Sequence, residues 1–212
     1  MLNDYSKILV VAPHTDDGEF GCGGTISKLV EEGKEVYYVY FSICEESVPP
    51  KFPKDILAEE VKKATQELGI KESNLISHRY PVRKFPQHRQ PILEDLIKIR
   101  KKINPEIVLL PSSADIHQDH STIFKEGRRA FKKVSILGYE LPWDNFELPA
   151  KAFVRLDEKH ILKKIKAIKE YKSQGHREYM SEEFVRSLSY LRGIQAGAKY
   201  AEAFEIIRWN MK

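Results

Sequence analysis

The sequence predicts an α/β fold in which helices cover both faces of a mostly parallel sheet. Short apolar runs rich in β-branched residues alternate with longer segments of helical spacing along most of the 212 residues. Such runs are typical of strands buried on both faces, and their alternation with helices is typical of parallel sheets. Because no repeat, low-complexity tract or linker interrupts the pattern, we expect residues 1–212 to form one domain.

The first half of the chain alternates strands and helices. The predicted strands cover residues 7–12, 35–43, 75–76 and 107–110. The predicted helices between them cover residues 22–32, 54–68 and 91–103. Gly33 and Gly69 follow the first two helices, where glycine commonly ends a helix, and Pro91 opens the third.

The second half continues this alternation. A helix is expected after His120, and Asp157 is expected to cap another helix. Further extended segments are predicted at residues 134–141, 153–156 and 204–209, and a last helix at residues 181–199. The pattern therefore supports a sheet with helices packed on both of its faces.

The composition excludes several classes of partner. The 35 basic and 31 acidic residues give a net charge of +4, which is too small to indicate nucleic-acid binding. No apolar run approaches the roughly 20 residues that span a bilayer, and Met1–Ser6 lacks the features of a signal peptide. Cys22 and Cys44 form no CxxC pair, which favours a reducing compartment. We expect a cytoplasmic protein, and a homo-oligomer only because oligomers are common among soluble proteins.

A histidine and two acids follow the first predicted strand, where that strand ends and a helix begins. The apolar run Ile8–Ala12 is followed by Pro13-His14-Thr15-Asp16-Asp17 and then by a glycine-rich segment. This segment does not match the G-x-G-x-x-G spacing, because position 26 is Ile26, and the chain has no G-x-x-x-x-G-K-[ST] loop. Alternatively, Asp16 and Asp17 could only cap a helix, and the glycines could only permit a tight turn or close packing.

A second polar turn, Ser112–His120, follows the strand predicted at residues 107–110. It contains His117, Asp119 and His120. The carboxyl ends of parallel strands meet at one edge of a sheet, where open α/β folds bind their ligands. We therefore expect the two polar turns to contribute to one pocket.

Two histidines and a carboxylate are a common ligand set for catalytic zinc. The separation of His14 and Asp17 by two residues lets one tight turn point both side chains inward, and His120 can provide the third ligand. The same ligand set also holds Fe²⁺ in non-haem oxygenases, so iron is an alternative occupant.

The remaining polar side chains of the two turns can serve proton transfer. Asp16 lies beside the expected metal without being needed as a ligand, so it can accept a proton from an activated water. His117 precedes His120 by three residues and, if protonated, can stabilise a developing oxyanion. Asp119 can orient His117 or a ligand histidine.

The two motifs resemble the LmbE-like, or PIG-L-like, deacetylase family. Its signature is a PHxDD turn after the first strand and a later HxDH-type turn, and this chain has Pro13–Asp17 and His117–His120. Gly23-Gly24 and Tyr200–Phe204 are also similar, so the resemblance covers nearly the whole chain. It implies a Rossmann-like fold and zinc-dependent removal of an N-acetyl group from an amino sugar.

The resemblance also implies a role for each polar residue of the two motifs. The metal ligands carried over by motif are His14, Asp17 and His120. Asp16 is carried over as the general base, and His117 as the group that stabilises the oxyanion or acts as an acid, with Asp119 tuning it.

The chain departs from this family at a position expected to contact the sugar. Members that act on glucosaminyl conjugates often carry an arginine before an E-x-x-x-A-x-x-x-L-G segment, whereas here Leu57 precedes Glu60. Basic residues of the irregular loop after the third strand could replace it by binding a phosphate or nucleotide, or could form a solvated surface. These residues are Arg79, Arg83, Lys84 and Arg89. Trp143 could stack on the sugar or belong to the core.

Three functions follow from these residues. The first is a metal-dependent amide hydrolase that releases acetate from a small N-acetyl amino sugar. The second is a non-catalytic nucleotide- or sugar-binding module of Rossmann-like fold, which the missing phosphate loop disfavours. The third is a metal-dependent phosphoesterase, although two-metal enzymes of that kind usually need more carboxylate ligands than the two turns supply.

Overall fold

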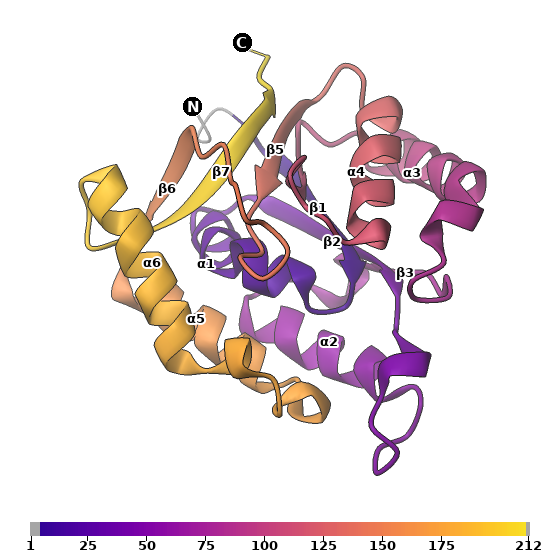
Figure 1. Cartoon of the computed structure of the whole chain (residues 1–212). Helices are drawn as coiled ribbons and strands as arrows, with labels where there is room; N and C mark the ends of the chain where they lie inside the picture. Colours follow the sequence, from indigo (N-terminus) through magenta and orange to yellow (C-terminus); the bar gives the residue numbers. More distant parts are fainter. Residues whose placement is uncertain (1–4, 211–212) are drawn as a thin grey trace.

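The computed structural model describes residues 5–210, which form a seven-stranded sheet with helices on both faces (Figure 1). The strands are β1 (Lys7–His14), β2 (Glu35–Ser42), β3 (Leu75–Ser77), β4 (Ile107–Pro111), β5 (Ser135–Tyr139), β6 (Ala152–Leu156) and β7 (Tyr200–Arg208). The α-helices are α1 (Asp17–Glu31), α2 (Ile56–Glu67), α3 (Arg89–Ile103), α4 (Gln118–Ala130), α5 (Glu158–Lys169) and α6 (Glu182–Ala196). The predicted α/β class is confirmed.

The sheet has the strand order β3-β2-β1-β4-β5-β7-β6. The five strands from β3 to β5 are parallel, whereas β7 is antiparallel to both of its neighbours. From β1, the chain first builds outward to β2 and β3 and then returns to add β4 on the other side of β1. The ends of β1 and β4 therefore form the switch point at which open α/β sheets bind ligands.

Side chains of β1 alternate between two buried clusters on opposite faces of the sheet. Ile8 and Val10 pack in the cluster that contains residues of α1, α2 and α5. Leu9 and Val11 pack in the cluster that contains residues of α3 and α4. A strand covered on both faces must be apolar at every position, which explains the continuous run Ile8–Ala12.

Helix α1 is kinked at Cys22, whose φ and ψ are not helical. The kink leaves backbone N–H and C=O groups of α1 without partners inside the helix. The buried ion pair of Lys164 and Glu202, with 2.7 Å between Nζ and Oε1, forms hydrogen bonds with these groups. The Glu202 carboxylate accepts the N–H groups of Gly24 and Thr25, and Lys164 donates to the carbonyl of Phe20 at 2.6 Å. Pairing of these groups avoids the free-energy cost of burying them unsatisfied.

Two helices begin earlier than the sequence predicts. Helix α1 starts at Asp17 rather than near Cys22, and α4 starts at Gln118 rather than after His120. The glycines that suggested a turn lie inside α1, where a Cβ at Gly21 would overlap the ring of Tyr139. Close packing of the helix on the sheet therefore explains this glycine.

The predicted lack of a signal peptide concerns Met1–Ser6, of which residues 1–4 lie outside the described residues. Among the helices formed by residues 5–210, none has the length and apolar character needed to cross a bilayer.

Candidate active site

Both predicted polar turns lie at the carboxyl ends of adjacent strands. His14 is the last residue of β1, and Asp17 is the first residue of α1. His117 is the N-cap of α4, and His120 lies in the first turn of that helix. Because β1 and β4 are neighbours in the sheet, the structure brings the two turns together at the switch point.

Three side-chain atoms from the two turns form a small triangle. Nδ1 of His14 and Nε2 of His120 each lie 3.2 Å from Oδ2 of Asp17, and the two nitrogens are 3.1 Å apart. Ligand atoms at this separation could be shared by one ion with bonds of about 2.0–2.2 Å, the lengths typical of zinc with nitrogen and oxygen ligands. The spacing and the donor types therefore fit a divalent metal ion.

Carboxylates behind the two rings orient the histidines. Nε2 of His14 lies 3.0 Å from Oδ2 of Asp119. Nδ1 of His120 lies 2.8 Å from Oδ2 of Asp115. Since an ionised carboxylate can only accept, each ring donates from this nitrogen, and in the neutral ring the other nitrogen then keeps a lone pair toward the triangle.

His117 lies beside the triangle, with its ring stacked on that of His120 and 4.4 Å between the centroids. The backbone N–H of Asp119 donates to Nδ1 of His117 at 3.1 Å. Because a backbone N–H can only donate, this bond leaves Nε2 to carry the proton of a neutral ring. His117 can therefore donate one hydrogen bond without being charged.

Two further groups of side chains lie close enough together to hold a metal ion. One is formed by His14, His117 and His120, and the other by Asp115, His120 and Asp144. Both groups include His120, so each overlaps the triangle. Nδ1 of His117 already accepts the N–H of Asp119, which leaves only Nε2 of that ring for a metal.

Electrostatics at the triangle favour positive charge. Burial lowers the pKa of His14, but Asp17 and Asp119 outweigh it and raise this pKa to about 9. Burial likewise opposes the charge on His120, yet Asp17 and Asp115 hold its pKa well above the ordinary value. Burial would raise the pKa of Asp17, but the two histidines hold it well below its usual range. These groups are therefore suited to surround a cation.

Asp16 has a different environment from its neighbour Asp17. It is the N-cap residue of α1, but its side chain makes no capping hydrogen bond and lines a cavity. Burial and the charge of Asp17 raise the pKa of Asp16 to about 6, while Arg177 opposes this shift. A carboxyl group with a pKa near neutrality is suited to proton transfer.

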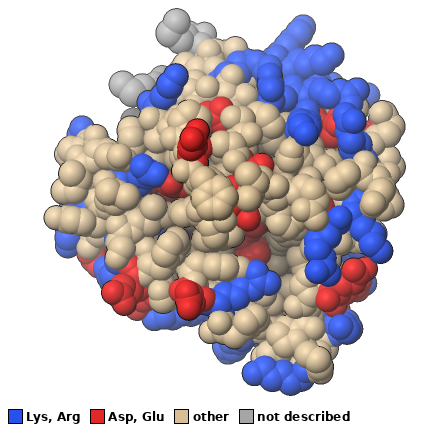
Figure 2. All heavy atoms as spheres, in the orientation of Figure 1, with Lys and Arg blue, Asp and Glu red and all other residues tan. Residues whose placement is uncertain are grey.

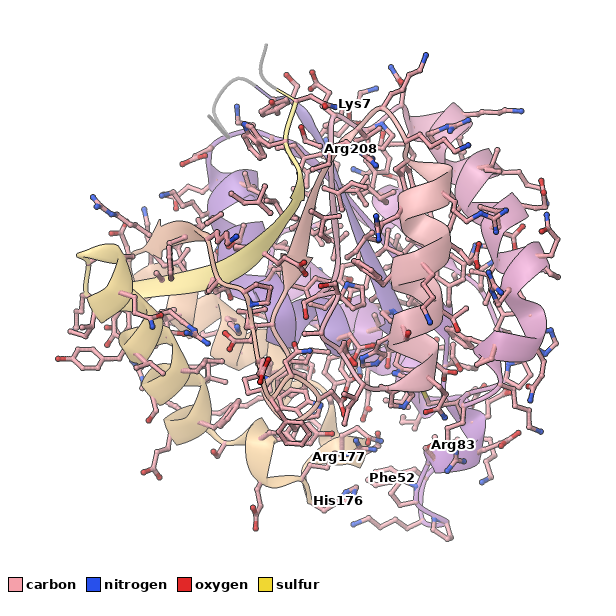
Figure 3. The ribbon with its side chains drawn as sticks, turned by 45° about the horizontal axis from the view of Figure 1, so that its top comes forward. Lys7, Phe52, Arg83, His176, Arg177 and Arg208 are labelled. Atoms are coloured by element: carbon pink, nitrogen blue, oxygen red, sulfur yellow. The ribbon has the colours of Figure 1, made fainter. Side chains whose placement is uncertain are left out.

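The cavity beside the triangle has a volume of about 270 Å³. The sequence predicted some of the residues that line it: His14, Asp16, Asp17, Arg83, His117, His120 and Trp143. Leu57, which occupies the place of the family arginine, also lines it. Figure 3 labels Arg83 and Arg177, both cavity-lining residues, along the lower edge of the molecule, far from Lys7 and Arg208.

Two of the predicted substrate-binding arginines lie elsewhere. Arg89 pairs with Glu126 through two nitrogens at 2.7 Å, and this carboxylate is fully buried between α3 and α4. Arg79 is largely exposed, with a nitrogen 3.7 Å from Glu45. Neither is among the residues that line the cavity. Arg89 therefore joins two helices, and Arg79 fits the solvated-surface alternative.

An aromatic wall closes one side of the cavity. Trp143 stacks on Tyr179 with 4.0 Å between the ring centroids and 14° between the ring planes. Phe20 packs edge-on against both rings. Trp143 packs against the core and also lines the cavity, so its stacking on a sugar stays a prediction that its position permits.

Sequence reasoning missed five residues of the site. These are Asp115, Asp144, Gln174, Arg177 and Tyr179. Asp115 lies in the same polar turn as His120, five residues earlier, so that spacing was an available signal. Arg177 and Tyr179 come from an irregular segment after α5, where no pattern marked them.

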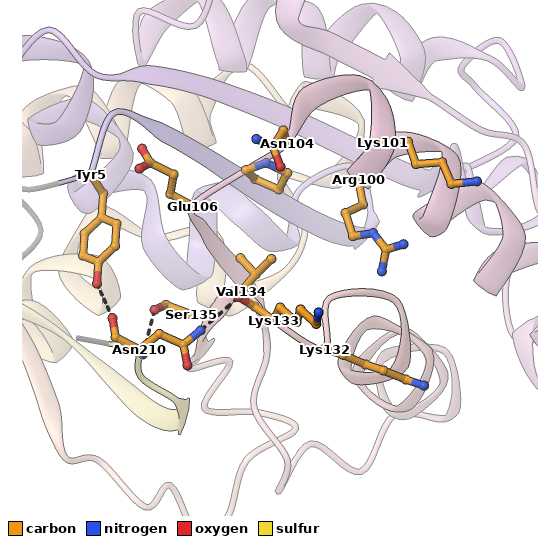
Figure 4. A pocket seen from close by; sticks show the side chains of 11 residues that line it. Tyr5, Arg100, Lys101, Asn104, Glu106, Lys132, Lys133, Val134, Ser135 and Asn210 are labelled. Carbon is orange, nitrogen blue, oxygen red and sulfur yellow. Dashed lines mark hydrogen bonds between the residues drawn. The ribbon is translucent and has the colours of Figure 1, made fainter. Parts of the chain in front are cut away.

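A larger cavity, of about 630 Å³, lies at the opposite end of the strands (Figure 4). Four of its lining side chains are cations: Arg100, Lys101, Lys132 and Lys133. Figure 2 shows Lys and Arg side chains gathered at the upper right, over the ends of α3 and α4. Cations at the carboxyl ends of helices interact favourably with the helix dipole. Among residues 5–210, no histidine lines this cavity, so we place the candidate chemistry in the smaller one.

The sequence matches the profile of PIG-L, described as GlcNAc-PI de-N-acetylase, over residues 9–131. This range covers more than half of the chain and contains both polar turns. The chain belongs to the PIG-L family. The resemblance drawn from the two motifs is therefore confirmed.

Curated relatives of this PIG-L family protein include two deacetylases. The "uncharacterized deacetylase YaiS" of Escherichia coli strain K12 is 28% identical over 176 residues, covering 81% of this chain and 93% of the relative. The diacetylchitobiose deacetylase of Thermococcus kodakarensis is 23% identical over 228 residues, covering 97% of this chain and 84% of the relative.

Two solved structures share the fold at 20% and 24% identity. The N,N'-diacetylchitobiose deacetylase of Pyrococcus horikoshii has a TM-score of 0.79 at 24% identity, covering 97% of this chain and 85% of that one. A 4-carboxy-2-hydroxymuconate hydratase from Pseudomonas putida has a TM-score of 0.77 at 20% identity, covering 98% of both chains. The fold alone therefore does not determine the reaction.

Proposed function

We propose that this PIG-L family protein is a metal-dependent deacetylase that hydrolyses the acetamido group of a small N-acetyl amino sugar. The observation that carries the proposal is the triangle of His14, Asp17 and His120, with Asp16 and His117 beside it in one cavity. The family match and the deacetylase relatives support the choice of substrate class.

His14, Asp17 and His120 would hold the ion, and zinc is the proposed metal. Fe²⁺ is compatible with the same donors and is the alternative. Asp119 and Asp115 would act behind the ligands by fixing the two imidazole rings. A divalent ion in this position supplies a Lewis acid that polarises the amide carbonyl and makes a water molecule more acidic.

Asp16 would take the proton from the attacking water as the new C–O bond forms. His117 would donate from Nε2 to the oxygen that gains negative charge, in the tautomer that the Asp119 backbone N–H favours. The C–N bond then breaks, and the proton held by Asp16 passes to the leaving nitrogen, with His117 as the alternative donor. The products are acetic acid and a free amine, which exchange a proton in water to give acetate and an ammonium group, so atoms and charge balance.

Acetate release from a panel of N-acetyl amino sugars tests this proposal, with and without a chelator. We expect release from at least one sugar, its loss with the chelator, and its return when zinc or Fe²⁺ is added back. A matched panel of phosphate esters tests the phosphoesterase alternative. Release of phosphate without acetate would overturn the proposal, as would tight sugar binding with no hydrolysis by metal-loaded protein.

A further inference from the structure

Arg177 lies in the wall of the active-site cavity although it comes from a segment far from both motifs. It precedes the short 3₁₀ helix Glu178–Met180 and lines the same cavity as Asp16 and His117. Figure 3 shows it at the edge of the molecule that also carries His176, Phe52 and Arg83. Its guanidinium is half-buried, so its charge is only partly screened by solvent.

The guanidinium of Arg177 is held by an aromatic ring and not by an acid. Its Nη1 donates to the hydroxyl of Tyr179, and its Cζ lies 5.7 Å from the centroid of that ring. Tyr179 is in turn stacked on Trp143. Among the described residues, no carboxylate oxygen lies within 4.0 Å of an Arg177 nitrogen, whereas Arg83, Arg89 and Arg192 each have such a partner.

An arginine with this arrangement is suited to bind an anion. The planar guanidinium offers five donors in a fixed fork that matches carboxylate and phosphate oxygens. The contact with Tyr179 uses one donor and limits the rotation of the side chain, so less conformational entropy is lost when an anion binds. The carboxylate whose charge acts most on Arg177 is that of Asp16. Asp16 is the proposed base, so it must stay free to exchange a proton.

We propose that Arg177 binds an anionic substituent of the substrate, a carboxylate or a phosphate, so that the enzyme prefers acidic N-acetyl amino sugars to neutral ones. This inference rests on the proposed deacetylase function. Trp143 and Tyr179 provide the apolar surface beside the guanidinium on which a sugar ring can pack. Arg177 would then determine specificity without taking part in bond breaking.

Matched substrates test the inference. The panel is N-acetylglucosamine, its 1-phosphate and 6-phosphate, and N-acetylmuramic acid, which carries a carboxylate. We expect the wild-type kcat/KM for at least one acidic sugar to exceed that for N-acetylglucosamine by tenfold or more. Arg177→Gln should reduce the ratio of acidic to neutral kcat/KM to within about twofold, chiefly by raising KM for the acidic sugar. Loss of the positive charge near Asp16 changes kcat for both kinds of sugar alike, so it does not alter this ratio.

Two variants serve as controls. Arg177→Lys keeps the charge but not the fork, so it should restore part of the preference if the protein is folded. Arg79→Gln removes an exposed arginine outside the cavity and should change nothing. Equal losses for neutral and acidic sugars in Arg177→Gln would overturn the inference, as would a wild-type preference for the neutral sugar.

Binding of the amine products gives a readout that does not depend on turnover. Calorimetry should show tighter binding of glucosamine 6-phosphate, glucosamine 1-phosphate or muramic acid than of glucosamine, and Arg177→Gln should remove the difference. If the wild type releases no acetate from any sugar, the proposed function fails. The binding comparison still decides the role of Arg177, because equal affinities for acidic and neutral sugars would overturn it.

Discussion

Nδ1 of His120 lies 2.8 Å from Oδ2 of Asp115, and the other oxygen of this carboxylate accepts the backbone N–H of His117 at 2.9 Å. The Asp115 carboxylate thus fixes two groups. One is the ring of His120, which contributes to the triangle, and the other is the backbone of His117, which lines the cavity. An amide at position 115 could instead direct an N–H at His120, which would move the ring proton to Nε2, the atom that faces the triangle.

Replacement of Asp115 by asparagine should therefore weaken metal binding about 10- to 100-fold. Competition with a chromophoric chelator measures this change. Asp144→Asn is the matched control, because its carboxylate lies 4.0 Å from Nδ1 of His120 and should matter little. A loss in Asp144→Asn as large as in Asp115→Asn would instead indicate that the ion is held by the group that contains Asp144.

Asp16 and His120 should separate turnover from metal binding. Asp16→Asn keeps the size of the side chain but removes the base, so we expect a loss of about 10²- to 10⁴-fold in kcat with unchanged metal content. His120→Ala removes a vertex of the triangle and should abolish metal retention. Elemental analysis of both purified variants, alongside acetate release, checks the assignment. Equal metal loss in the two variants would contradict it.

Because neutral His117 can donate from Nε2, two substitutions of this residue should reduce activity to different extents. His117→Ala removes the Nε2 donor and should lower kcat about 10²- to 10³-fold without loss of metal. His117→Gln can place an amide N–H near the same position and should retain more activity than the alanine variant. If His117→Ala lost the metal, the group of His14, His117 and His120 would be favoured as the binding site.

Glu19 should make stability depend on pH. It is fully buried, accepts from Tyr171 at 2.9 Å and contacts Tyr38, and has no cation within 4.0 Å among the described residues. Burial raises its pKa from 4.5 to about 8 despite these hydrogen bonds. The unfolded chain loses this proton near pH 4.5 while the folded chain keeps it, so the contribution of Glu19 to the free energy of unfolding falls between about pH 4.5 and 8.

Glu19→Gln has no titratable proton and can keep both contacts, because its oxygen accepts from one tyrosine while its amide nitrogen donates to the other, whose hydroxyl can donate to the carbonyl of Thr15. Its stability relative to wild type should therefore rise by roughly 1–3 kcal/mol between pH 5 and pH 8, as measured by urea unfolding. Glu19→Ala should be less stable by about 2–4 kcal/mol at either pH, because it leaves a cavity and removes the acceptor from the tyrosines. A constant difference between Glu19→Gln and wild type across this range would refute the prediction.

The sheet and the meeting of the two turns could be predicted because both depend on local signals. Apolar runs such as Ile8–Ala12 mark buried strands, and the topology rule then brings His14 and His120 to one edge. The start of α1 could not be predicted so well. Asp16 precedes it without a capping hydrogen bond, and its glycines pack closely against side chains of neighbouring strands and of α5, which the local sequence does not reveal.

Other features depended on contacts between distant segments. Tyr179 and Arg177 reach the cavity from an irregular segment with no periodic pattern. Arg89 was predicted to contact the substrate because of its basic neighbours. In the structure it forms an ion pair with Glu126, a buried residue of another helix, and this pair lies outside the cavity. The organisation as one domain, the oligomeric state, the location and the roles of the site residues stay predictions.

The loop before α3 holds Asp119 with its backbone. The N–H groups of Arg83 and Phe85 donate to the Asp119 carboxylate at 2.5 and 3.1 Å, and Arg83 adopts a φ of +65° there. A backbone donor does not depend on the identity of its side chain, so substitutions at exposed positions of this loop that keep its backbone conformation need not disturb the orientation of His14. Changes in this part of the cavity lining can therefore occur without moving the ring of His14, on which the proposed metal site depends.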